Sequence, residues 1–80
     1  MKLIETEWNN YRNAVIPKDA PPVQVVESRR AFFAGAWALY ALQMNHLDED
    51  REPTEADLKF MASLDAEMRQ FGERVKKGWA

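Results

Sequence analysis

Cysteine is absent from this 80-residue chain and histidine occurs only once. Without cysteine there is no disulfide and no thiolate metal site, and one histidine cannot build a metal centre without carboxylate help. The acidic residues 48–50 follow His46 closely, but no glycine lies where a calcium-binding loop needs its turn. The sequence therefore predicts no metal site and no cofactor.

Residues that form catalytic motifs are also scarce. The three glycines form no phosphate-binding loop. Ser28 and Ser63 are the only serines, and neither lies in a nucleophile motif. With no catalytic group of residues to point to, the sequence predicts a protein that acts by binding and is not an enzyme.

The chain has no excess of positive charge. Its 11 basic and 13 acidic residues give a net charge of −2, which argues against nucleic-acid binding because that requires a basic face. The charges are unevenly distributed, with five basic and four acidic residues in 1–30 but six basic and nine acidic residues in 48–80. An anionic ligand is therefore expected in the N-terminal region.

No long hydrophobic run is present. The longest uncharged run, residues 31–47, has 17 residues, fewer than the roughly 20 that a membrane-spanning helix needs. Glu5 and Glu7 stand where a signal peptide would be apolar. We expect no membrane segment, and the absence of cysteine fits a reducing cytoplasm.

Apolar periodicity and helix-end signals predict three helices. The first covers about residues 3–15 and is ended by Pro17, since the residue before a proline is displaced from helical geometry. The second runs from near Pro22, which is tolerated in a first turn, to about residue 47. Thr54 caps the third, with Asp57 completing a variant capping box.

These elements predict an all-α fold in a single helical domain, residues 1–80. One helix is short, and the two long helices are expected to form an antiparallel hairpin. The third helix carries a nearly heptad apolar seam of Leu58, Met61, Leu64, Met68, Phe71 and Val75. Its outer faces carry acid–base pairs four residues apart, namely Glu55/Lys59, Asp65/Arg69 and Glu73/Lys77.

The second helix has two contact faces. The large apolar stripe is expected to pack on the third helix and on the Trp8/Tyr11 face of the first; it contains Val26, Phe33, Trp37, Tyr40, Met44 and Leu47. The opposite face is small and uncharged where a solvent-facing side would be charged, and contains Ala31, Gly35, Ala38 and Leu42. One short helix and one long helix do not easily cover both faces. We therefore expect self-association through this central helix, and the alternative is that another helix of the same chain packs there.

Arg29 and Arg30 are the principal candidates for binding an anion. An arginine at the edge of an apolar stripe needs an anion or an exposed head group. Either it pairs internally, with Glu27 or an acid from another helix, or it holds a ligand phosphate or carboxylate in fork geometry. In the second case Trp8 or Tyr11 would offer a stacking surface, and Gln24 and Glu27 would hydrogen-bond a base or ribose.

A signature runs through the first half of the chain: Trp8-x-x-Tyr11, then Ile16-Pro17-x-Asp19-Ala20-Pro21-x-x-Gln24-x-x-Glu27-x-x-Arg30-Ala31-Phe32-Phe33-Ala34-Gly35-Ala36. With this string the chain resembles a family of small bacteriophage proteins of unassigned role. The resemblance implies a phage accessory protein that acts in the cytoplasm of a bacterial host. It carries over no catalytic or binding residue.

Small phage accessory proteins often counter host defence, and this analogy sets the functional expectation. The leading prediction is a homo-oligomer that sequesters a small anionic, nucleotide-like host immune signal at a subunit interface. The alternatives are a small protein-binding inhibitor or adaptor that occupies a host protein, and an accessory of virion assembly. No nucleic-acid or membrane partner is expected.

Overall fold

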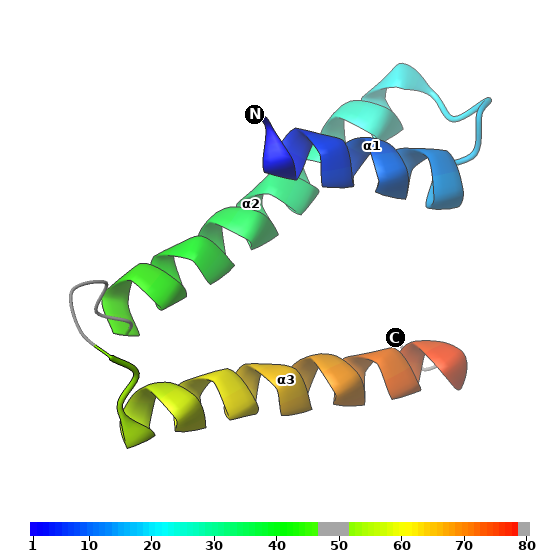
Figure 1. Cartoon of the computed structure of the whole chain (residues 1–80). Coiled ribbons are helices and arrows are strands. Elements are labelled where there is room, and N and C mark those ends of the chain that lie inside the picture. The colour runs from blue at the N-terminus through cyan, green and yellow to red at the C-terminus, as the bar shows by residue number, and fades with distance from the viewer. Residues whose placement is uncertain (47–51, 79–80) are drawn as a thin grey trace. The chain divides into compact units, whose positions relative to one another are not determined.

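The computed structural model describes residues 1–46 and 52–78, and every regular element in these ranges is an α-helix (Figure 1). Helix α1 covers Leu3–Val15, α2 covers Pro22–His46 and α3 covers Glu55–Lys76. The predicted all-α class and the three predicted helices are confirmed. Two expectations concern positions outside the described residues: the place of Leu47 in the apolar stripe, and the acidic residues 48–50 that follow His46.

Two compact units divide the chain, Met1–Leu42 and Gln43–Ala80, with their boundary inside α2. The first unit holds α1 and most of α2, and the second holds the end of α2 and all of α3. A single domain and an antiparallel hairpin of the two long helices stay predictions.

A short linker turns the chain between α1 and α2. Ile16 has extended backbone geometry, with φ −85° and ψ 126°, as expected for a residue that precedes a proline. The Ala20 N–H then donates to the Pro17 carbonyl at 3.1 Å, which closes a tight turn. The first turns of α2 therefore fold back beside α1 (Figure 1).

Trp8 is the centre of the contact between α1 and α2. It is only 2% exposed and is the one buried hydrophobic residue among those the structure describes. Its ring centroid lies 6.1 Å from that of Tyr11 and 5.6 Å from that of Phe32, and the Tyr11 and Phe32 centroids are 5.5 Å apart. Offset and tilted aromatic pairs at such distances are favourable beyond the apolar area they bury.

The face of α2 that meets α1 is centred on Phe32 and not on the predicted stripe. Of that stripe, Phe33 is half-buried, whereas Trp37 is 68% exposed. Val25, Ser28, Phe32 and Ala36 are half-buried as well. These four positions are three or four residues apart and therefore lie on one side of the helix. The prediction chose the face of α2 with the largest apolar side chains. The observed face instead includes Ser28 and Ala36, whose small side chains leave room for the close approach of α1.

In the second unit, the start of α3 is fixed locally. The Asp57 N–H donates to the Thr54 hydroxyl at 3.1 Å, and the Thr54 N–H donates to an Asp57 carboxylate oxygen at 2.9 Å. The predicted capping box is therefore confirmed. Nearby, the His46 ring stacks on Phe60 with centroids 4.6 Å apart.

The outer faces of α3 carry the expected local ion pairs. Lys59 lies 3.6 Å from Glu55, and Arg69 lies 2.8 Å from Asp65, both at the predicted spacing of four residues. A further pair joins Lys76 and Glu73 at 3.5 Å, three residues apart. All these side chains are exposed, so each pair contributes only about 0.3–0.5 kcal/mol to the stability of the helix.

Candidate functional site

Arg29, the first predicted anion ligand, has an acidic partner on the neighbouring helix. Its guanidinium donates to a carboxylate oxygen of Glu5 at 2.6 Å, joining α2 to α1. The same guanidinium lies 4.5 Å from the centre of the Phe33 ring, in a cation–π contact. Its side chain is 48% exposed and is held in place by these two contacts.

Arg30 pairs within its own helix. Its guanidinium lies 3.2 Å from a carboxylate oxygen of Glu27, one turn earlier, and its side chain is 74% exposed. The pair with Glu27 is the internal arrangement that the sequence left open as an alternative. Its exposure places Arg30 in solvent and not at the edge of a core.

Of the other predicted ligand residues, Glu27 pairs with Arg30, whereas Trp8, Tyr11 and Gln24 have no hydrogen bond or ring contact with either arginine in the described residues. Trp8 is buried in the ring cluster, so no face of its ring is open for stacking, whereas Tyr11 keeps an exposed part. Gln24 is exposed in the first turn of α2, where its backbone N–H donates to the Pro21 carbonyl at 3.0 Å. The two hollows described below, one at the linker and one on α3, are lined by none of the six predicted residues.

The first hollow lies where α1 runs into the linker. It is open to solvent and has a volume of about 530 Å³. Its lining comes from α1, the linker and the first turns of α2, and consists of Asn9, Arg12, Asn13, Ile16, Pro17, Lys18, Ala20 and Val25. The whole lining therefore belongs to the first unit.

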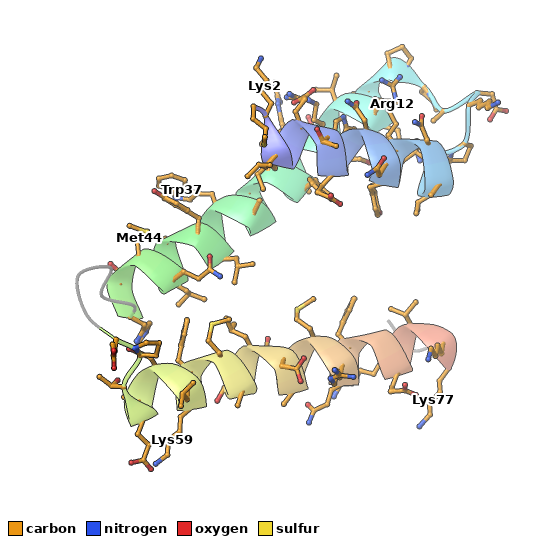
Figure 2. All side chains as sticks on the ribbon, in the orientation of Figure 1. Lys2, Arg12, Trp37, Met44, Lys59 and Lys77 are labelled. Carbon is orange, nitrogen blue, oxygen red and sulfur yellow. The ribbon has the colours of Figure 1, made fainter. Side chains whose placement is uncertain are left out.

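Helical spacing brings the polar part of this lining together. Asn9, Arg12 and Asn13 lie at positions i, i+3 and i+4 of α1, so they share one side of the helix. Arg12 lies in the last turn of α1, near the linker (Figure 2). The tight turn that begins at Pro17 then adds Lys18 to the same hollow.

The charge of the hollow is positive. Arg12 and Lys18 contribute two cations, and no carboxylate belongs to the lining. Neither side chain has an ion pair or hydrogen bond within residues 1–46 and 52–78, which sets them apart from Arg29 and Arg30. An anion entering here would therefore not have to displace an internal acid.

The lining suits a ligand with both charged and polar groups. The guanidinium of Arg12 offers parallel donors that match a phosphate or carboxylate, and Lys18 offers a mobile point charge. The amides of Asn9 and Asn13 each provide donors and an acceptor, so they can recognise a heterocyclic base or a ribose. A volume of about 530 Å³ lies within the usual range for small-molecule sites.

Sequence reasoning did not single out Asn9, Arg12, Asn13 or Lys18. A weak signal was present, because the N-terminal region had the more basic balance and was already expected to hold an anionic ligand. The spacing Asn9-x-x-Arg12-Asn13 is also consistent with one polar helix side. The contribution of Lys18 depends on the path of the linker, which periodicity does not specify.

Two other properties follow from the described ranges. Residues 1–46 and 52–78 contain no group of three or more histidine, aspartate or glutamate side chains placed to share a metal ion. Within the same ranges, every helix is too short or too polar to cross a membrane.

Comparison with known proteins gives no relative. No protein-family model, no curated protein and no solved structure matches this chain. The functional proposal therefore begins from the residues that line the hollow.

Proposed function

We propose that this protein binds and sequesters a small anionic, nucleotide-like molecule, whose phosphate-bearing part occupies the hollow between α1 and the linker. The observation that carries the proposal is the pair Arg12 and Lys18, two cations without acidic partners that line one hollow together. Arg12 and Lys18 replace Arg29 and Arg30 as the proposed principal ligands, because Arg29 and Arg30 already form ion pairs with Glu5 and Glu27.

The chemistry of the lining favours binding over turnover. Its side chains are two amides, two cations and four apolar residues, and none of them is a general base or a nucleophile at neutral pH. Stoichiometric capture of a signalling nucleotide fits such a site. The resemblance to small phage proteins supplies the setting, a phage accessory protein that counters host defence in a bacterial cytoplasm.

Assembly into a homo-oligomer is part of this proposal. Ala31, Gly35 and Ala38, on the small face of α2, are all exposed, and a Cβ built on Gly35 would have no neighbouring atom within 4 Å. A second backbone therefore has room to approach this face closely. We expect a mass in light scattering that exceeds that of one chain at micromolar concentration. Gly35→Leu should lower this mass, and a mass that Gly35→Leu leaves unchanged would refute assembly through α2.

Titration calorimetry of the purified chain tests the proposal, with ADP-ribose, a cyclic dinucleotide and inorganic phosphate as probes. At least one nucleotide should bind. It should bind more tightly than phosphate alone, because Asn9 and Asn13 can also hydrogen-bond its base or ribose. Arg12→Ala/Lys18→Ala should weaken binding at least tenfold, since a hydrogen bond to a charged group contributes about 1.5–3 kcal/mol. Lys2→Ala, which removes an exposed cation outside the hollow, should leave affinity within twofold.

The binding should also weaken as salt is raised, because both cations are open to solvent and screened by ions. A nucleotide that binds equally well to Arg12→Ala/Lys18→Ala would refute the assignment of the hollow. Failure of all the nucleotide probes to bind would refute the ligand class.

A protein-binding inhibitor or adaptor is the second candidate function. It is favoured by two exposed aromatic side chains of α2, Trp37 and Tyr40, whose ring centroids lie 5.8 Å apart. Aromatic and methionine side chains are enriched at protein interfaces. Trp37→Ala should abolish capture of a host protein under this alternative and leave nucleotide affinity unchanged under the first.

A further inference from the structure

Helix α3 carries an apolar seam with strict heptad spacing. Met61, Leu64, Met68, Phe71 and Val75 follow one another at alternating intervals of three and four residues. All of them except half-buried Leu64 are exposed, and Met68 is 65% exposed. A seam of this kind is normally completed by the apolar seam of a partner helix.

Two charged residues flank this seam on the same side. Glu67 and Arg74 are one heptad apart, each directly before a seam residue, and with Gln70 and Phe71 they line a hollow of about 280 Å³. Seven residues of helix separate them by about 10.5 Å along the axis, too far for a direct ion pair. Neither has an ion-pair partner in the described parts of the chain, although Arg69 and Lys76 on the same helix do.

We propose that two copies of this chain pair through α3 in antiparallel orientation, with Met68 of one copy opposite Phe71 of the other. The same register places Leu64 opposite Val75 of the second copy. In an antiparallel pair, the positions directly before the first seam residue of each heptad face each other. Glu67 therefore lies beside Arg74 of the second copy, and the two-fold axis generates this ion pair twice.

Charge selects this register over its neighbours. An antiparallel pair shifted by one heptad brings Glu67 against Glu67 of the second copy and Asp65 against Asp65, and both contacts are repulsive. A parallel, in-register pair places Glu67 near Gly72 of the second copy, which has no side chain to pair with it. Like charges at an interface cost several kcal/mol, so flanking charges decide orientation as well as partner.

This surface shares no residue with the hollow of Arg12 and Lys18, so the inference goes beyond the proposed function and does not depend on it. It is also separate from the small face of α2. The two self-association surfaces use different helices, and each is testable without altering the other.

A charge exchange tests the ion pairs. In a Gly35→Leu background, which blocks the small face of α2, sedimentation analysis of the full chain should give a dimer. This dimer should dissociate at least tenfold more readily when Glu67→Arg is added, because two arginines then face each other. Arg74→Glu should behave alike, and Glu67→Arg/Arg74→Glu should restore the dimer to within about threefold. The matched control Glu55→Lys/Lys59→Glu reverses a pair away from the seam and should leave the dimer unchanged, with helicity checked by circular dichroism.

Oxidative crosslinking tests the orientation, because the chain has no cysteine of its own. A mixture of Leu64→Cys and Val75→Cys proteins should form a disulfide between the two variants, and Val75→Cys alone should not. Efficient crosslinking of Val75→Cys alone would establish a parallel pair and overturn the proposal. Absence of the mixed disulfide would also overturn it. The proposal would also be overturned if the charge variants left the dimer unchanged. A wild-type chain that remains monomeric, because its seam packs within the same chain, would overturn it as well.

Discussion

The contacts inside each of the two units of this protein are of different kinds. In Met1–Leu42, contacts distant in sequence dominate, with Trp8 against Phe32 and Glu5 against Arg29. In the second unit, the ion pairs of Lys59, Arg69 and Lys76 and the capping box join residues three or four apart, whereas the stack of His46 on Phe60 reaches further. Tertiary structure is therefore concentrated in the N-terminal unit.

The positive charges of the two units differ in the same way. On α3, Lys59, Arg69 and Lys76 each have an acid within one turn, so they stabilise the helix locally. In the first unit, Arg12 and Lys18 have no such acid and share a hollow. A cation without a partner contributes little to folding, which makes these two the better candidates for a ligand.

Removal of the Trp8 side chain should have the largest effect on stability. Trp8→Ala leaves a cavity at the centre of the ring cluster and should lower the free energy of unfolding by about 3–5 kcal/mol. Trp37→Ala is the matched control, because that tryptophan is 68% exposed, and should change it by less than about 1 kcal/mol. Urea denaturation followed by circular dichroism measures both. Equal losses would show that tertiary contacts are not concentrated around Trp8.

The cap of α3 should have a smaller effect. Thr54→Ala removes the hydroxyl that accepts from the Asp57 N–H, and should cost about 1 kcal/mol. Ser63→Ala removes a hydroxyl from an exposed position inside the same helix and should be neutral or slightly stabilising, since alanine is the better helix former. Thermal melts of the two variants give the comparison, and a larger loss for Ser63→Ala would contradict it.

The smallest difference in the free energy of unfolding is expected between alanine variants of the two arginines of α2. Arg29→Ala breaks the contact with Glu5 on α1 and the cation–π contact with Phe33, for a loss of about 1 kcal/mol. Arg30→Ala breaks only an exposed pair within the helix and should cost less than about 0.5 kcal/mol. The same denaturation experiment distinguishes them. If Arg30→Ala is the more destabilising, Arg29 does not join the two helices.

Local signals account for the parts of the fold that the sequence predicted. Pro17 and Pro22 bracket the linker, and the Thr54/Asp57 capping box marks the start of α3, so the helix bounds follow from neighbouring residues. The centre of the contact face of α2 was predicted wrongly, because Phe32 and Phe33 are adjacent and both apolar. Which of the two phenylalanines packs against Trp8 depends on how closely α1 approaches, and this is a tertiary property that the local sequence does not specify.

The candidate site was less predictable than the fold. Arg29 and Arg30 stood out because they are adjacent on an apolar helix, but their acids are supplied by Glu5, 24 residues away, and by Glu27. Arg12 and Lys18 looked like ordinary surface cations. Only the turn of the linker brings them to one hollow, and no residue pattern specifies that path.

The central claim is that the anion is held by cations without acidic partners and not by the arginines of α2. Calorimetric titration of the same nucleotide into wild type, Arg12→Ala and Arg30→Ala tests it most directly. The account predicts at least tenfold weaker binding for Arg12→Ala and a change within twofold for Arg30→Ala. Full affinity in Arg12→Ala together with a tenfold loss in Arg30→Ala would contradict it.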